Sequence, residues 1–350
     1  MQSCSRTQAM IRTLARATEH PASGGVFYSA DGAKTASPTL NADPSWDWTP
    51  TQTARAAGTS TCMFPLTLGC EPWLFDDGKE WLHPRFSDPA QIADFEPPDV
   101  HSGRTGEVLA TIRTLAESLP PGQLIRDPDT QSPLGVAELM WDDSFYLAIT
   151  DHPGEVHALI DKITDFIIEF IREVHVAAQG RLNPCGFPPI WAEGPGTMIA
   201  DDSMSLVSPA MHREFSIPYL NRIADVVGPV WYHSCTWREQ YFANLRDLRN
   251  VVAWNWNPGN SCDPAVVMKE FGGTAVLTPH IVADMHRDND LLHFGFADEV
   301  DLVRYILDHK PKDTVLYFWL SNVTQKREAI EGIYALMDER GHSPRAVLCE

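Results

Sequence analysis

The stretch His233-Ser234-Cys235 places an imidazole and a thiol two residues apart, at the end of a predicted strand. Side chains two apart on a strand point to the same face, so these two can hold one cation between them. Zinc favours mixed nitrogen and sulfur ligands, and a catalytic zinc takes three protein ligands plus an open position. The spacing therefore predicts a zinc site at His233 and Cys235.

A third ligand has to come from another segment. Cys262 ends the loop that follows the next predicted strand, and this loop contains the glycine and asparagine residues that let a chain fold back. Glu193 and His280 follow other predicted strands and are the alternatives. Cys262 is the first candidate for the third ligand, and Glu193, His280 and the absence of a metal stay open as alternatives.

Further polar and aromatic residues gather at predicted strand ends. For substrate binding we expect Arg126, Trp191, Tyr232, Asn255 and Trp256. For proton transfer the candidates are the carboxylates Glu193 and Asp202, because a positioned carboxyl group can act as a general acid or base.

These side chains need a scaffold that brings strand ends together. From about residue 105 the chain alternates helical patterns with short apolar runs, and apolar stretches near residues 26 and 64 supply two earlier strands. Eight candidate strands interleaved with helices predict an α/β fold of the (β/α)8 TIM-barrel type. A doubly wound open sheet is the alternative, but the first half lacks a GxGxxG turn.

Local signals mark elements within this scaffold. Ser208-Pro209 is typical of a helix start, and residues 136–150 show one continuous helical pattern. Residues 1–60 form an irregular N-terminal extension, and residues 61–350 form the predicted barrel domain.

Composition excludes several classes of protein. The chain has 27 basic and 47 acidic residues, a net charge of −20 that disfavours nucleic-acid binding. No apolar run approaches the ~18 residues of a membrane span. Seven cysteines form no CxxC pair, which favours a reducing, cytoplasmic location.

Two blocks of sequence carry a family resemblance. The first runs from Ala200-Asp-Asp-Ser through Ser208-Pro-Ala-Met-His-Arg-Glu-Phe to Pro218-Tyr219, and the second is Trp231-Tyr-His-Ser-Cys235. They resemble the uroporphyrinogen decarboxylase superfamily, and within it the cobalamin-dependent methyltransferase branch more than the true decarboxylases. The resemblance extends from about residue 105 to the end, and more loosely from about residue 60. It implies a TIM barrel whose mouth binds a thiol, a corrinoid methyl donor or a tetrapyrrole.

Departures from the family pattern refine this expectation. The arginine-rich amino-terminal signature of the decarboxylases is missing, so uroporphyrinogen is not the expected substrate. The late cysteine ligand of the methyltransferases is missing from residues 317–322, and Thr236 replaces the glycine after the His-x-Cys pair. Asp284-Met-His286 matches a corrinoid-binding motif only in part, so a corrinoid would arrive on a separate protein. The likeness also implies that Asp202 faces the cavity and Asp201 does not.

Three functions follow as hypotheses. The first is a zinc-dependent methyltransferase that acts on a small thiol or a methylated small molecule, with a corrinoid protein as partner. The second is a divergent decarboxylase or lyase for a small organic acid, and the third is a non-catalytic binding barrel. A homodimer is left open as the oligomeric state.

Overall fold

The computed structural model describes residues 53–340, apart from residues 55, 57–58, 77, 79, 121–123, 185–195, 283–294, 313, 315, 317 and 322–326. Four expectations lie outside the described residues: the strand near residue 26, the candidates Trp191 and Glu193, and the motif at residues 284–286. Within the described part, helices alternate with parallel strands in a mixed α/β structure.

Two parallel sheets form the centre of the molecule. The smaller has the order β1-β4-β5, from Thr53–Ala54, Leu124–Arg126 and Leu182–Asn183. The larger has the order β10-β9-β8-β7-β6; its strands are Thr197–Ala200 (β6), Val230–Ser234 (β7), Val251–Trp256 (β8), Val276–Val282 (β9) and Trp319–Ser321 (β10). In each sheet, neighbouring strands follow one another in chain order, an arrangement that fits a TIM barrel.

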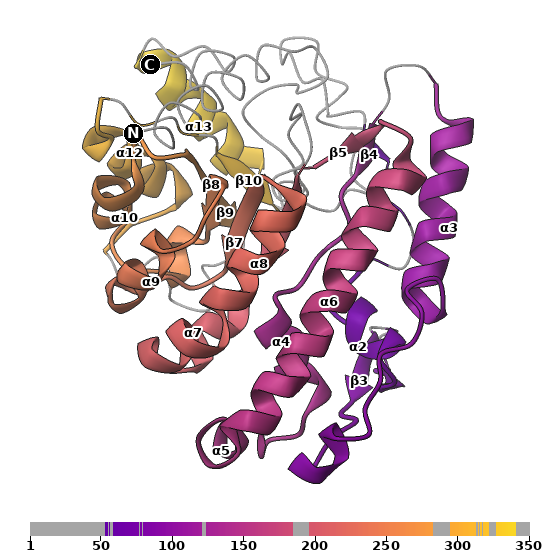
Figure 1. Ribbon diagram of the computed structural model, residues 1–350. Helices are drawn as coiled ribbons and strands as arrows, with labels where there is room; N and C mark the ends of the chain where they lie inside the picture. Colours follow the sequence, from indigo (N-terminus) through magenta and orange to yellow (C-terminus); the bar gives the residue numbers. More distant parts are fainter. Residues whose placement is uncertain are drawn as a thin grey trace.

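Helices cover the sheets and connect the strands (Figure 1). The described helices are α2 (Met63–Thr67), α3 (Gly103–Ser118), α4 (Pro133–Met140), α5 (Phe145–Asp151), α6 (Pro153–Ala178), α7 (Pro209–Phe215), α8 (Ile217–Val227), α9 (Phe242–Arg246), α10 (Pro264–Phe271), α12 (Glu299–His309) and α13 (Arg327–Glu339). The longest, α6, packs against α3, α4 and α8 through a stripe of buried aliphatic and phenylalanine side chains. None of the described helices is long and apolar enough to cross a membrane.

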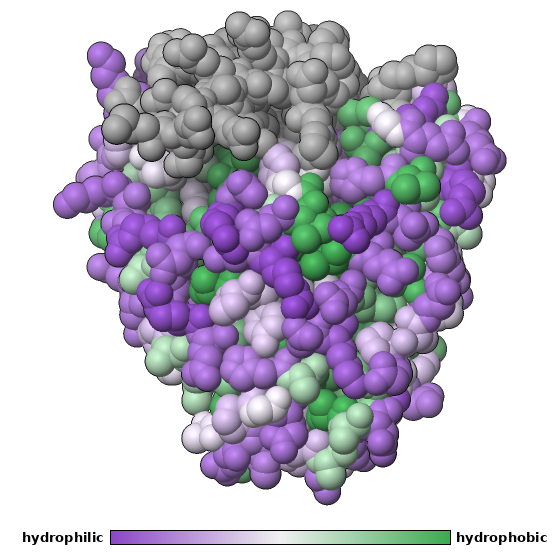
Figure 2. Space-filling view, in the orientation of Figure 1, coloured by the Kyte–Doolittle hydropathy of each residue, from purple (hydrophilic) through white to green (hydrophobic). Residues whose placement is uncertain are grey.

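Helix starts follow the capping signals of the sequence. The Ser208 hydroxyl accepts a hydrogen bond from the Met211 N–H (3.2 Å), and Pro209 is the first residue of α7, so the predicted start is confirmed. Asp298 caps α12 in the same way, through the Asp301 N–H. Figure 2 shows that the outer surface on this side of the molecule is mostly hydrophilic, with hydrophobic residues in small separate areas.

The structure corrects two predicted elements. Phe64 lies in α2 and is fully buried, whereas the sequence predicted a strand there. The helix predicted over residues 136–150 is divided into α4 and α5, because Trp141 is extended and pairs with Phe86. Strands β1, β5 and β6 were not predicted, nor was the antiparallel hairpin of β2 (Glu71–Leu74) and β3 (Glu80–His83).

The segment after β4 ties the smaller sheet to β6. The buried Asp127 carboxylate accepts hydrogen bonds from the Met198 N–H (2.8 Å) and the Thr197 hydroxyl (2.9 Å). Further along, Gln131 forms a parallel bridge with Ala200. The chain after β4 therefore runs beside β6 and reaches the strand ends where the candidate ligands lie.

Candidate metal centre and its pocket

Three potential metal ligands converge where β6 and β7 end. The Cys235 Sγ lies 3.3 Å from the His233 Nε2, and this nitrogen lies 3.6 Å from an Asp202 carboxylate oxygen. All three ligand atoms are within 4.8 Å of one another. The structure thus brings together the two residues of the His-x-Cys pair and one of the two adjacent aspartates.

Strand alternation explains which side chains meet. Ala200 of β6 is paired with His233 of β7, and Ile199 with Tyr232. Asp202 is two residues beyond Ala200, so it emerges on the face that carries His233, while Asp201 emerges on the face of Tyr232. The two aspartates therefore enter different environments.

Asn255 fixes the orientation of the His233 ring. The Asn255 side-chain amide donates to the carbonyl of Thr278, so its oxygen is directed at His233. The His233 Nδ1 lies 2.5 Å from that oxygen and must carry the proton that it accepts. Nε2, on the side of Cys235 and Asp202, is left with its lone pair, the arrangement that metal-binding histidines commonly show.

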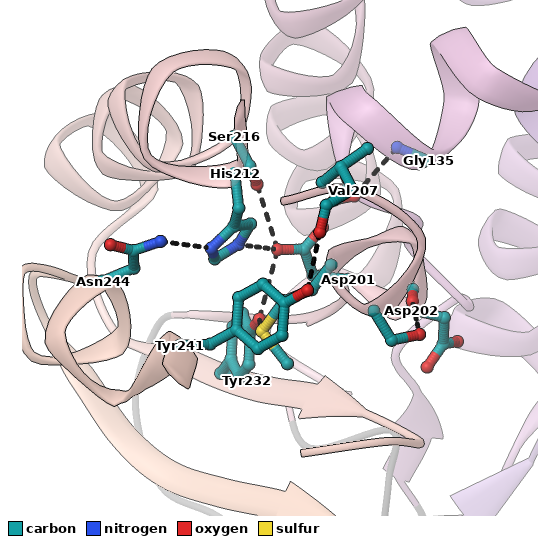
Figure 3. A network of polar contacts seen from close by, with 12 residues as sticks. Gly135, Asp201, Asp202, Val207, His212, Ser216, Tyr232, Tyr241 and Asn244 are labelled. Atoms are coloured by element: carbon teal, nitrogen blue, oxygen red, sulfur yellow. Dashed lines mark hydrogen bonds and ion pairs between the residues drawn. The ribbon is translucent and has the colours of Figure 1, made fainter. Parts of the chain in front are cut away.

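Asp201 lies in a buried network with His212, Ser216 and Tyr232 (Figure 3). One of its oxygens accepts from the Ser216 hydroxyl (3.0 Å), the Tyr232 hydroxyl (3.1 Å) and the His212 Nε2 (3.0 Å). Asn244 donates to the other ring nitrogen of His212, so a neutral imidazole satisfies both contacts. Burial would raise the pKa of Asp201, but the contacts with His212 and nearby hydroxyls hold it below its ordinary value. The network anchors the turn that presents Asp202.

A pocket of about 310 Å³ opens beside the three ligands. Asp202 and Cys235 form part of its wall, and the remaining described lining residues are Thr61, Trp81, Gln131, Gly135, Glu138, Leu139, Ser203, Ser205 and Leu206. Hydroxyl and amide groups alternate there with an indole and two leucines. This composition is typical of a site for a small organic molecule.

Burial favours the neutral forms of two acidic groups beside the imidazole of His233. Burial, reinforced by the Asp202 carboxylate, raises the pKa of the Cys235 thiol well above its ordinary value. Burial also raises the pKa of Asp129, which interacts with both His233 and Asp202. A divalent cation bound there would favour the thiolate.

The donor set fits zinc. It supplies one imidazole nitrogen, one thiol and one carboxylate, all ordinary zinc ligands. Ligand atoms held about 2.0–2.3 Å from a tetrahedral zinc lie about 3.3–3.6 Å apart. The sulfur–nitrogen separation of 3.3 Å and the nitrogen–oxygen separation of 3.6 Å lie in that range.

Cys262, the expected third ligand, is not part of this group. Its N–H donates to the Trp237 carbonyl (2.8 Å), and Asp263, the next residue, caps α10. The loop from Asn257 is folded as a short 3-10 turn stabilised by the Asn257 side chain, so it does not bring the thiol to His233. His280, an alternative ligand, is also outside the group, and burial beside His233 lowers its pKa to about 3.

Tyr232 and Trp256 depart from their expected place in the substrate pocket. They alternate with His233 and Asn255 along β7 and β8, so they point to the opposite face of the sheet. There both are buried and pack around Trp237, at ring distances of 6.2 and 5.8 Å.

Two other expected substrate contacts are buried. Arg126 is 5% exposed at the end of β4, and Asn255 is 1% exposed and occupied with His233. Neither belongs to the described lining of the pocket.

Glu138 is a pocket residue that the sequence interpretation missed. It projects from α4, and its carboxylate accepts from the Tyr146 hydroxyl (3.0 Å) and the Ser203 hydroxyl (3.5 Å). Burial raises its pKa above the ordinary value. A single glutamate on a predicted helix has no pattern that separates it from a solvated surface residue, so no local signal identified it.

Comparison with known families gives one match. Residues 59–181 match the family model described as uroporphyrinogen decarboxylase (URO-D). No curated protein matches the chain. The match supports a relationship to the uroporphyrinogen decarboxylase superfamily, whose members are generally enzymes, and it ends before the three candidate ligands.

Proposed function

We propose that the chain is a zinc-dependent enzyme that transfers a methyl group between small molecules, with Asp202, His233 and Cys235 as its zinc ligands. The observation that supports this most strongly is the convergence of three chemically suitable ligand atoms at one end of β6 and β7, beside a pocket. A zinc ion held there would lower the pKa of a substrate thiol and so supply a thiolate nucleophile.

The surrounding residues would prepare the site for this chemistry. Asn255 keeps the His233 Nδ1 protonated, and the Cys235 N–H donates to Asp202 (2.6 Å), which restricts the carboxylate. Gln131 and Ser205 offer polar contacts to a substrate, while Leu139 and Leu206 would exclude water from it. The pocket would hold a small thiol or a methylated small molecule, and a corrinoid carried by a separate protein is the proposed partner in methyl transfer.

The first experiment tests the metal itself. The protein is purified without added metal, dialysed and examined by elemental analysis, beside His233→Ala. About one equivalent of zinc is expected in the parent protein. The zinc content of His233→Ala should be at least tenfold lower, because one of the three ligands is removed. His309→Ala is the matched control, since His309 is exposed on α12. Zinc absent from the parent protein, or unchanged in His233→Ala, would exclude the proposed centre.

A decarboxylase is the second candidate, favoured by the description of the matching family model. The described lining of the pocket contains carboxylates and no lysine, arginine or histidine, which is unsuited to a polycarboxylate such as uroporphyrinogen. Incubation with uroporphyrinogen should therefore release no carbon dioxide. Release of carbon dioxide at catalytic rates would replace the methyltransferase proposal with the decarboxylase.

A further inference from the structure

We propose that the pocket beside Asp202 and Cys235 binds an organic cation of the onium class, a quaternary ammonium or sulfonium, held by the Glu138 carboxylate and the Trp81 ring. This inference deepens the proposed function, and rests on it only in taking this pocket as the substrate site. It assigns the substrate by charge and shape.

The charge of the pocket is the first argument. Of the described lining residues, Asp202 and Glu138 carry acidic groups and none is basic. If a divalent cation is bound, Asp202 and the Cys235 thiolate neutralise it, so Glu138 remains as the uncompensated charge facing the cavity. The net charge of −20 on the whole chain adds a long-range attraction for cations.

Two hydrogen bonds orient the Glu138 carboxylate. The hydroxyls of Tyr146 and Ser203 each donate to a different carboxylate oxygen, which fixes the orientation of the group. Neither donor carries a positive charge, so the carboxylate has no ion-pair partner in these two contacts. Each oxygen keeps acceptor capacity for a ligand.

Trp81 supplies the second element of recognition. It projects from β3, lines the pocket and is 40% exposed, so part of its indole ring is open to a ligand. An aromatic face attracts onium groups, and indole does so most strongly. Leu139 and Leu206 add apolar surface for the methyl groups of such a cation. Carboxylate, indole and leucines together suit a cation with an apolar exterior better than a strongly hydrated metal ion or an anion.

Three probes of nearly equal shape test the charge preference. Choline is the cation, 3,3-dimethylbutan-1-ol is its neutral counterpart, and 3,3-dimethylbutanoate is the anion. Isothermal titration calorimetry on the zinc-loaded protein at pH 8 should show choline binding about tenfold more tightly than the alcohol, with the anion weakest. Equal affinities, or preference for the anion, would overturn the proposal.

Two variants with matched controls locate the site. Glu138→Gln should reduce choline affinity by about tenfold and leave the alcohol nearly unchanged, whereas Glu169→Gln, on the exposed side of α6, should change neither. Trp81→Leu should reduce choline affinity by about fivefold. Trp73 is the cross-strand neighbour of Trp81, and Trp73→Leu should leave choline affinity unchanged. If choline affinity survives both pocket variants, the cation does not bind there. The Trp81 variant also keeps the test decisive if Glu138→Gln does not fold.

The same samples separate this inference from the proposed function. Elemental analysis gives their zinc content independently of ligand binding. A zinc-loaded protein without preference for choline would contradict the onium site and leave the metal centre intact. A clear preference for choline in a protein that binds no zinc would contradict the metal centre and leave the onium site intact.

Discussion

Two adjacent carboxylates after β6 have opposite environments. Asp201 is fully buried among His212, Ser216 and Tyr232, whereas the Asp202 side chain is 43% exposed beside His233. Burial with three hydrogen bonds to one carboxylate oxygen suits a structural role, and partial exposure near a thiol and an imidazole suits a ligand. Substitution of Asp201 should therefore affect mainly stability, and substitution of Asp202 should affect mainly zinc binding.

Asp201→Asn should lower the free energy of unfolding of the metal-free protein by about 1–3 kcal/mol, because it disturbs a buried network. It should leave zinc affinity within about threefold. Asp202→Asn should show the reverse. Its free energy of unfolding should stay within about 1 kcal/mol of the parent value, and its zinc affinity should fall at least tenfold. Urea unfolding and chelator competition measure the two quantities. The opposite pattern in the two variants would show that the roles are exchanged.

The contact between Asn255 and His233 makes a second prediction at this scale. Asn255→Leu keeps a similar volume but removes the acceptor that fixes the protonated ring nitrogen. Zinc affinity should fall by about 10- to 100-fold, as losses of such supporting contacts do. Asn221→Leu removes a buried amide of α8 that bonds to Asp247 and Arg249 instead, and should leave the affinity unchanged. Equal affinities in the two variants would mean that His233 needs no such support.

At the scale of elements, the tie between β4 and β6 depends on Asp127. Burial raises the pKa of Asp127 to about 8, although Thr197 and Met198 donate to it. The ordinary value in an unfolded chain is near 4. Between these two values the folded protein holds a proton that the unfolded chain has lost, so stability decreases as pH rises through this window and levels off above about 8.

Asp127→Asn removes this titration and keeps an oxygen for the Met198 N–H. The free energy of unfolding of the variant, relative to the parent, should therefore increase from pH 4 to 8, by up to about 5 kcal/mol. Urea unfolding of both proteins across that range measures the difference. A difference that stays constant with pH would show that Asp127 is ionised throughout.

Some elements could be predicted from the sequence because their determinants are local. The Ser208-Pro209 start of α7 and the shared face of His233 and Cys235 depend on neighbouring residues alone. The burial of Tyr232 also follows from alternation, once His233 is placed. By contrast, the position of the Asn255 amide beside the His233 ring and the pairing of β6 with β7 depend on register between strands, which no local pattern specifies. The separation of Cys262 from His233 and the place of Glu138 in the pocket wall depend on the same long-range packing.

At the scale of the whole molecule, the family match and the candidate site cover different parts of the chain. The match spans residues 59–181, which contain β4, α6 and the pocket residues Trp81 and Glu138. The candidate ligands lie beyond it, on the larger sheet. The pocket wall is thus formed by both parts: Trp81 and Glu138 come from the matched segment, whereas Ser205 and Leu206 come, like the proposed metal ligands, from the later part of the chain.

The most direct test of the metal centre is the spectrum of the protein loaded with cobalt(II), which takes the ligand geometry of zinc and reports it. The account predicts a near-ultraviolet sulfur-to-cobalt charge-transfer band in the parent protein, with the intense visible bands of a tetrahedral site. The charge-transfer band should disappear in Cys235→Ser and persist in Cys262→Ala. The assignment of Asp202, His233 and Cys235 as the ligands would be contradicted if the parent protein showed no charge-transfer band. It would also be contradicted if the band disappeared in Cys262→Ala and persisted in Cys235→Ser.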